Sequence, residues 1–401
     1  MKQAYLIDGI RTPVGNFGGT LSTIRTDDLA ALVIAELMRR NANIDPAAIG
    51  DVIFGCANQA GEDNRNVARM SLLLAGLPFT VPGETVNRLC ASGLSAAINS
   101  ARAIHSGDGD LFIAGGVENM TRGPWVFSKA SSPFGRDAEM HDSSFGWRFI
   151  NPKMKEMYGV DAMGETAENL AERDGVSREN QDKFAFWSQQ KATIAQKDGR
   201  FTEEIIAVPI PQKKKEPILF AKDEFIKSST TLEGLSNLKP AFRKNGTVTA
   251  GNASGLNDGA AALLLASEVG VKLFNLIPKA RIVSMSVAGV EPKYMGMGPV
   301  PASEMALKKA GLTMNDIGII EINEAFASQV LVCLKGLRIQ PNDTRVNPNG
   351  GAIAIGHPLG MSGARILNSA AIELHKQNKQ YALVTMCIGV GQGYAVVIEK
   401  V

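Results

Sequence analysis

The sequence contains few of the residues that build metal sites or disulfide frameworks. Its four histidines and four cysteines are widely spaced, and no CxxC, HxxxH or HExxH pattern occurs; the cysteines are Cys56, Cys90, Cys333 and Cys387. Sparse cysteines without a pairing pattern are typical of a protein in a reducing compartment. We therefore expect a cytoplasmic protein with no metal site and no disulfide scaffold.

Signals for membranes and nucleic acids are also missing. The first residues, Met1–Gly9, contain no sustained apolar stretch, and no apolar run in the sequence reaches the ~20 residues of a membrane span. The formal net charge is only +2. Bulk electrostatics therefore favour neither nucleic acid nor a membrane as a partner.

Two common nucleotide-binding motifs are absent as well. No GxxxxGK[ST] pattern occurs, and the glycine-rich stretch Gly389–Tyr394 departs from GxGxxG at its last position. A strand-like run follows this stretch, whereas a dinucleotide fingerprint opens a helix. We expect neither a P-loop nor a nicotinamide site.

Short β-rich runs alternate with helix-like runs along the chain. The length of 401 residues exceeds one ordinary core and predicts two or three domains. The alternation predicts an α/β protein with a largely parallel sheet. The expected strands are 4–10, 51–56, 84–89, 110–115, 260–266, 281–287, 317–322, 381–386 and 394–399, and the main expected helices are 26–40, 64–74, 91–106, 178–197, 302–309, 324–335 and 361–376.

The two ends of the chain resemble each other at an offset of 270 residues. This offset aligns Asn87–Gly93 with His357–Gly363, and it places the expected strand near 111 on the one at 381. Such similarity indicates an internal duplication, in which a pseudo-twofold axis would bring the two aligned turns together. The identical pairs are Leu89 with Leu359, Ser92 with Ser362 and Gly93 with Gly363.

The region from residue 121 to about 250 lacks this rhythm. It contains all three tryptophans, several prolines and the basic run Lys213–Lys215. Such a run is most often a solvated surface. We interpret the region as an inserted, more irregular subdomain.

Three reactive side chains stand in turns between elements. Cys90 precedes an expected helix, where free N–H groups favour a thiolate, although a lone cysteine is more often a buried structural residue. His357 lies among glycines and is a candidate base for such a thiol, or simply a turn residue before Pro358. Cys387 opens a glycine loop whose N–H groups suit an oxyanion hole.

Asn323 is a fourth candidate. It follows an expected strand and precedes an expected helix in Glu321–Phe326. A helix N-cap and a polar site residue are both compatible with this position.

Together these motifs resemble those of the thiolase family over essentially the whole chain. The nucleophile motif of that family resembles Asn87–Gly93, and its other catalytic loops resemble three further segments: Asn323–Phe326, Gly350–Pro358 and the Cys387 loop. Val390 departs from the family's third glycine position, while Gly389 is retained.

The resemblance implies a five-layer αβαβα fold built from two similar halves and an inserted loop domain. We expect residues 1–120 with 256–278 to form the first half, 121–255 the loop domain over the substrate, and 279–401 the second half. The resemblance also implies a homo-oligomer, either a dimer or a tetramer.

The resemblance further implies coenzyme A as a substrate, with no permanently bound cofactor. His357 would activate Cys90, which would take the acyl group from a 3-oxoacyl-CoA, and Cys387 would act as acid and base. His357 with a water on Asn323 would form one oxyanion hole, and the N–H groups of Cys90 and Gly389 the other. Further residues would contact CoA: Ser254, Met163 and Met295 along the pantetheine tunnel, and Lys227 near the nucleotide.

Two segments are most similar to the 3-oxoadipyl-CoA thiolases, Gly55–Asn66 and Phe145–Pro152. Because an arginine fork pairs well with a carboxylate, we expect Arg148 to bind the distal carboxylate of such a substrate; the alternative is a surface or interface arginine. The rival functions are an acetoacetyl-CoA thiolase, a non-catalytic acyl-CoA-binding protein on the same fold, and a cysteine-dependent hydrolase.

Overall fold

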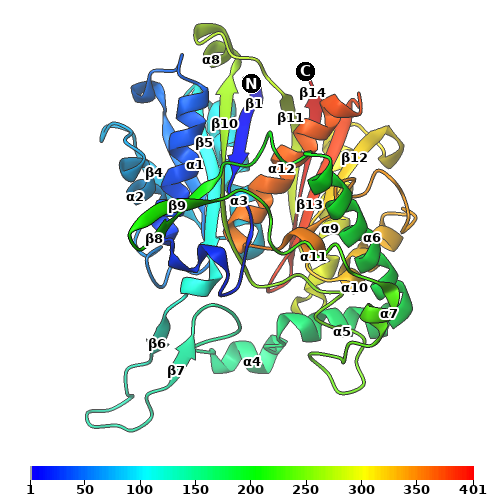
Figure 1. The fold of residues 1–401 in the computed structure, drawn as a ribbon. Helices are drawn as coiled ribbons and strands as arrows, with labels where there is room; N and C mark the ends of the chain where they lie inside the picture. Colours follow the sequence, from blue (N-terminus) through cyan, green and yellow to red (C-terminus); the bar gives the residue numbers. More distant parts are fainter. Residues whose placement is uncertain (1) are drawn as a thin grey trace.

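The computed structural model describes residues 2–401 and contains a ten-stranded sheet made of two halves (Figure 1). The two halves meet at β1 and β11, which pair only through Tyr5–Arg281 and Leu6–Ala280. The strand order in the first half is β4 (Gly83–Val86), β3 (Asp51–Gly55), β5 (Leu111–Asn119), β10 (Asn257–Ser267) and β1 (Ala4–Arg11). The order in the second half is β12 (Ile317–Ile322), β13 (Tyr381–Ile388), β14 (Gln392–Lys400) and β11 (Ala280–Gly289). The tenth strand, β2 (Gly15–Asn16), pairs with the start of β10.

The two halves share a topology. β3 pairs in parallel with β5, as β12 does with β13, and the next two pairings are antiparallel in both halves. The offset of 270 places β5 on β13, as the sequence similarity predicted. The duplication inferred from a few identical residues is therefore visible in the strand order.

Three hydrophobic clusters separate the layers. The middle cluster combines α3 (Ser92–Ser106) and α12 (Leu359–Lys376) with the inner faces of both half-sheets. A second cluster lies between the first half-sheet and α1 (Thr26–Arg40) with α2 (Val67–Leu74). A third lies between the second half-sheet and α9 (Pro299–Ala310) with α10 (Ala327–Gly336). This order of layers confirms the five-layer αβαβα fold.

Strand side chains alternate between these clusters, as the pleat requires. In β10, Leu263 and Leu265 face the middle helices, and Leu264 faces α1. Both faces of each half-sheet are covered, so its strands are apolar on both sides. This explains the continuous hydrophobic runs in the sequence.

The expectation of a largely parallel sheet is wrong, because the sheet is mixed. Three of the main strand pairings are parallel, β3–β4, β3–β5 and β12–β13, and the others are antiparallel. β13 and β14 are joined by a loop of three residues, Gly389–Gly391. A connection this short closes only a hairpin, whereas parallel strands need a long crossover.

The inserted region contains two small hairpins and several helices. These are β6 (Trp125–Phe127) with β7 (Met140–Asp142), β8 (Val208–Gln212) with β9 (Lys215–Phe220), and the helices α4 (Pro152–Tyr158), α5 (Met163–Asp174), α6 (Arg178–Lys197) and α7 (Leu232–Ser236). In Figure 1 the β6–β7 hairpin projects from the body as an arm, while α5 and α7 lie low in the view and α6 runs beside the second half.

Buried ion pairs fasten the inserted region to the first half. Arg11 at the end of β1 donates to Glu204 and Asp223, and all three side chains are almost fully buried. The domain boundaries given above stay predictions. Among residues 2–401, no helix has the length and apolar character needed to cross a membrane.

Candidate active site

Close packing of two helix starts brings the candidate turns together. A Cβ added at Gly93 would lie 2.3 Å from the Gly360 carbonyl oxygen, and one at Gly363 would lie 2.3 Å from the Leu94 nitrogen. Only glycine permits this approach of α3 to α12. The turn that carries Cys90 consequently contacts α12, which begins two residues after His357, and β13, which contains Cys387.

Cys90 lies in a 3₁₀ turn, Leu89–Ala91, that leads into α3. Leu89 has a φ of +47°, which is unfavourable for a branched side chain. Burial raises the pKa of the Cys90 thiol, and a hydrogen bond from the Gly389 backbone N–H acts in the opposite direction. The resting residue is therefore a neutral thiol, and the Gly389 N–H favours its anion.

His357 is 4% exposed, and both of its ring nitrogens have partners. Nδ1 lies 2.6 Å from Ser362 Oγ, and Nε2 lies 3.3 Å from Asn323 Nδ2. The backbone N–H donates to Asn257 Oδ1 over 2.9 Å. Burial, with a smaller effect from the nearby Arg365 charge, lowers the pKa of His357 to about 3. The imidazole is therefore neutral at physiological pH and able to accept a proton.

Asn323 is not an N-cap, because α10 begins at Ala327 with Phe326 in the cap position. Its side chain instead reaches His357, and its Oδ1 is a buried acceptor with no hydrogen-bond partner among residues 2–401. The neighbouring Glu324 was not identified from the sequence. Its carboxylate accepts from Ser188, Asn347 and the Ile353 N–H, and so joins the Asn323 loop to the loop before His357.

Cys387 lies near the end of β13 and is 1% exposed. It belongs to a small apolar cluster that includes Met295, Ala325 and Phe326. Burial raises the pKa of the Cys387 thiol well above its ordinary value, and a charge on the nearby Cys90 raises it further. Both thiols are therefore neutral at rest, and ionising Cys90 opposes the ionisation of Cys387.

The loop after Cys387 carries backbone strain. Val390 has a φ of +63°, a conformation that costs a β-branched residue roughly 1–2 kcal/mol. An added Cβ at the preceding Gly389 would lie 3.2 Å from Leu89 Cδ1 and 3.6 Å from Met163 Sδ. The strained segment therefore holds the Gly389 N–H against the Cys90 turn.

We expect Val390→Gly to increase the free energy of unfolding. Relief of the strain at φ +63° exceeds the added chain entropy of glycine, which gives a net gain of about 0.5–1 kcal/mol. Urea unfolding at fixed protein concentration measures this change, with Val269→Gly, at an exposed helical position, as a control that should destabilise. A lower midpoint for Val390→Gly would show that the side chain supports the loop.

The four residues expected to contact CoA lie around this centre. Met163 begins α5 beside Gly389, and Met295 packs in the cluster of Cys387. Ser254 donates its backbone N–H to the Ala325 carbonyl, in the Asn323 loop. Lys227 lines a cavity of about 280 Å³ that also touches Ile353, close to His357 in the chain.

Arg148 connects the two segments that are most similar to the 3-oxoadipyl-CoA thiolases. Its guanidinium donates to Asn58 Oδ1 and to the Ser143 carbonyl, both over 3.3 Å. Asn58 donates its N–H to Glu118, which also accepts from the Gly360 N–H. The arginine is thus linked through two hydrogen-bonded residues to the turn that follows His357.

Glu118 was also missed from the sequence. It is 2% exposed and accepts from the N–H groups of Ala57, Asn58 and Gly360. Burial raises the pKa of Glu118 to about 7. Cys56 and Asp63 lie close by, but the Glu118 carboxylate already binds three backbone donors, so its role is to hold the 57–58 loop against the His357 turn.

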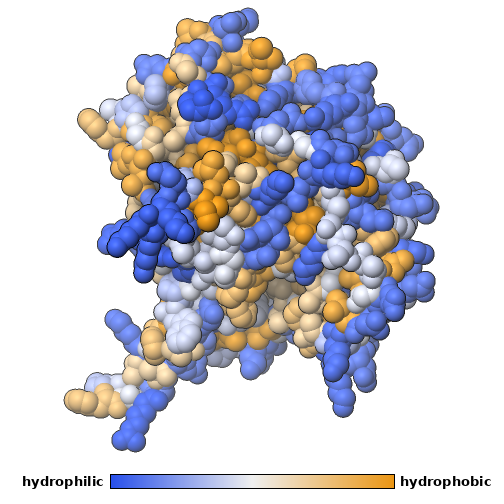
Figure 2. Space-filling model, viewed as in Figure 1, coloured by the Kyte–Doolittle hydropathy of each residue, from blue (hydrophilic) through white to orange (hydrophobic). Residues whose placement is uncertain are grey.

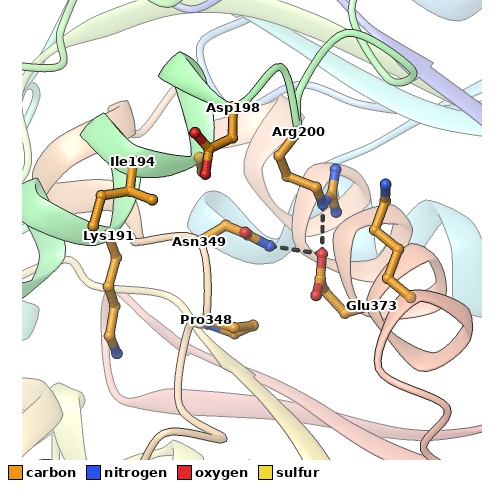
Figure 3. Close-up of a pocket in the computed structure, with 9 residues that line it drawn as sticks. Lys191, Ile194, Asp198, Arg200, Pro348, Asn349 and Glu373 are labelled. Atoms are coloured by element: carbon orange, nitrogen blue, oxygen red, sulfur yellow. Dashed lines mark hydrogen bonds and ion pairs between the residues drawn. The ribbon is translucent and has the colours of Figure 1, made fainter.

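A separate cavity of about 270 Å³ lies between α6 and the start of the Gly350 loop (Figure 3). Arg200 and Asn349 both donate to Glu373 on its wall. It contains none of the predicted site residues. We interpret it as a packing gap beside the ion pair.

Comparison with known proteins agrees with this geometry. The thiolase N-terminal domain family matches residues 4–269, and the thiolase C-terminal domain family matches residues 276–400. The chain therefore belongs to the thiolase family, whose members are acyltransferases. The resemblance found in the motifs is confirmed over both halves.

Several relatives match along their full length. A "3-oxoadipyl-CoA/3-oxo-5,6-dehydrosuberyl-CoA thiolase" of Escherichia coli is 57% identical over 401 residues, which is 100% of each chain. A "Beta-ketoadipyl-CoA thiolase" of Acinetobacter baylyi is 55% identical, also with 100% of each chain covered. An "Acetyl-CoA acetyltransferase" of Cupriavidus necator is 45% identical with the same coverage.

The fold also matches solved structures. The crystal structure of human mitochondrial 3-ketoacyl-CoA thiolase in complex with CoA superposes with a TM-score of 0.92 at 38% identity. The match covers 100% of this chain and 98% of that one.

Proposed function

We propose that the protein cleaves 3-oxoadipyl-CoA with CoA, giving succinyl-CoA and acetyl-CoA through an acyl-Cys90 intermediate. The observation that supports this most directly is the convergence of four separate motifs. The Cys90 turn lies against α12 and β13, Asn323 contacts the His357 ring, and Gly389 lies beside the Cys90 turn, where its N–H favours the thiolate. The family membership and the 57% identical relative support the reaction and its substrate.

In the first half-reaction the Cys90 thiol gives its proton to His357 and attacks the C3 carbonyl of the substrate. The C2–C3 bond breaks, and the electron pair leaves on the acetyl-CoA carbanion. Cys387 donates its proton to this carbanion, which departs as acetyl-CoA. The succinyl group stays on Cys90 as a thioester.

In the second half-reaction the thiol of free CoA loses a proton to the Cys387 thiolate and attacks the acyl-Cys90 thioester. Succinyl-CoA leaves, and Cys90 recovers its proton from His357. The N–H groups of Cys90 and Gly389 bind one oxyanion, and His357 with a water on Asn323 binds the other. The free acceptor of Asn323 supports this assignment of a water.

CoA would lie under the inserted region. Met163 and Met295 flank Gly389 and Cys387, and Ser254 lies on the neighbouring loop. These residues would line the pantetheine arm. Lys227, on the 280 Å³ cavity, would meet the nucleotide end through its positive charge.

A cleavage assay with three substrates tests the proposed function. CoA-dependent release of acetyl-CoA is measured with 3-oxoadipyl-CoA, acetoacetyl-CoA and a long-chain 3-oxoacyl-CoA. The highest kcat/KM is expected for 3-oxoadipyl-CoA. A preference for acetoacetyl-CoA would indicate an acetoacetyl-CoA thiolase. Absence of turnover would indicate a binding protein, and release of free acid would indicate a hydrolase.

Arg148→Ala is expected to lower kcat/KM for 3-oxoadipyl-CoA by about tenfold or more while sparing acetoacetyl-CoA. A charge-assisted hydrogen bond to the distal carboxylate is worth ~1.5–3 kcal/mol. Lys153→Ala removes a nearby exposed cation and serves as the control. An equal loss on both substrates would assign Arg148 to holding Asn58 rather than to specificity.

We also propose that the arm, residues 125–142, joins copies of the chain into a tetramer. Trp125 is 67% exposed and Phe127 69% exposed, on a hairpin that projects from the body (Figure 2). Exposed aromatic residues of this kind mark an interaction surface.

The double variant Trp125→Ser with Phe127→Ser should give dimers by light scattering. The control Ile277→Ser changes a side chain outside the arm that is 83% exposed, and it should not alter the mass. An unchanged mass would exclude the arm from assembly.

A further inference from the structure

The hydrogen bonds around His357 determine which ring nitrogen carries its proton. Ser362 Oγ has one proton, and it lies 2.8 Å from the Pro358 carbonyl, an acceptor only. Ser362 Oγ must therefore accept from His357 Nδ1, 2.6 Å away. The proton is on Nδ1, and the Nε2 lone pair faces the Asn323 amide nitrogen, 3.3 Å away.

The first half of the duplication contains a corresponding serine, Ser92, whose hydroxyl has different hydrogen-bond partners. Ser92 Oγ donates to the Leu89 carbonyl over 2.7 Å and accepts from the Arg88 N–H over 2.9 Å. At the offset of 270, Ser92 corresponds to Ser362 and Arg88 to Pro358. Proline has no N–H. Ser92 Oγ accepts from the Arg88 N–H, but Pro358 offers no such N–H to Ser362. The Ser362 hydroxyl oxygen is therefore free to accept from the His357 ring.

We infer that Ser362 is a positioning residue that holds His357 in the Nδ1–H tautomer. It can do so because Pro358 has no N–H to occupy the Ser362 hydroxyl oxygen. This inference rests on the proposed role of His357 as the base for Cys90. A ring with its proton on Nε2 has no lone pair on that atom and cannot take the thiol proton. Asn323 does not set the tautomer by itself, because its amide offers both a donor and an acceptor.

The surrounding contacts leave this task to Ser362. The backbone N–H of His357 is fixed by Asn257, which places the residue but does not reach the ring. Ser362 is fully buried on the first turn of α12, so water does not replace its hydroxyl freely. Losing this partner leaves the ring free to populate the unproductive tautomer.

The experiment compares wild type, Ser362→Ala, Ser362→Thr and Ser100→Ala. Ser100 is a matched control, since its buried hydroxyl also donates to the carbonyl four residues earlier, over 3.1 Å, but contacts no candidate site residue. Ser362→Ala should lower kcat for thiolysis by roughly 10–100-fold with KM little changed, by analogy with other partners that orient a functional histidine. Ser362→Thr should recover most of the loss, and Ser100→Ala should show none.

A spectroscopic measurement separates positioning from a structural effect. Ring ¹⁵N NMR of histidine-labelled protein, with His357→Ala used for assignment, reports which nitrogen is protonated. Wild type should show Nδ1–H, and Ser362→Ala should gain Nε2–H. A wild-type Nε2–H tautomer, or an unchanged tautomer in Ser362→Ala, would overturn the inference, even if the variant is slow or unstable. Full activity of His357→Ala would instead contradict the proposed function.

Discussion

Replacing Cys90 with alanine should reduce thiolysis by at least about 10³-fold, because no other thiol in the site is placed to carry the acyl group. Cys387 is 1% exposed and held in an apolar cluster, whereas Cys90 is partly exposed and has a backbone donor at its sulfur. Cys90→Ser should be nearly as inactive, since a hydroxyl is a far weaker acid than a thiol. The measurement is the initial rate of CoA-dependent cleavage.

Mass spectrometry tests the intermediate directly. Brief incubation with an acyl-CoA and no acceptor, followed by acid quench and digestion, should place the acyl mass on the peptide that contains Cys90. Cys333→Ala removes a different buried thiol, one whose hydrogen bond goes to the Gly296 carbonyl, and should keep both the label and the rate within a few fold. Label on another residue, or substantial turnover by Cys90→Ala, would reject the covalent mechanism.

Much of the fold follows from patterns of side chains. The helix predicted at 178–197 and the strand predicted at 317–322 have the observed bounds, because apolar spacing and flanking polar residues define both ends. The pairing of the strands was harder to predict from the sequence. β1 and β10 form antiparallel partners although residues 12–256 separate them, and periodicity within a strand carries no information about such long-range pairing.

The candidate site shows a similar division. Cys90, His357 and Cys387 were identifiable because each reactive side chain stands next to a glycine-rich turn or a helix start. Ser362 was visible only as a match to Ser92, and nothing in its local sequence indicates that it contacts an imidazole. Its role depends on the path of the turn at Pro358, which only the three-dimensional structure supplies.

The strained residues mark a further limit. Leu89 and Val390 adopt positive φ, against the preference of branched side chains, and each stands next to a candidate catalytic group. Local propensity predicts glycine or asparagine at such positions. These conflicts occur where the backbone is held by tertiary contacts, as is common at functional sites.

Replacing Cys387 with alanine should separate the two chemical steps. Cleavage of 3-oxoadipyl-CoA and the reverse condensation should fall by ~10²–10⁴-fold, the usual contribution of a general acid–base group. Burial keeps the pKa of Cys387 high, so its thiol retains the proton that the carbanion needs. Acylation of Cys90 by a simple acyl-CoA breaks no carbon–carbon bond. Its leaving group is the CoA thiolate, which needs a proton far less than a carbanion does, so the acyl group should still be trapped on Cys90.

Cys387→Ser is the matched control, because it keeps the size of the side chain and removes only the acidity. It should lose cleavage like Cys387→Ala while still trapping the acyl group on Cys90. If both variants also lost acyl transfer, the cause would be movement of the Gly389 N–H away from Cys90, since that donor follows Cys387 on the same short loop. Wild-type cleavage by Cys387→Ala would mean that another group protonates the carbanion, and His357 would be the next candidate because its Nε2 has just received the Cys90 proton.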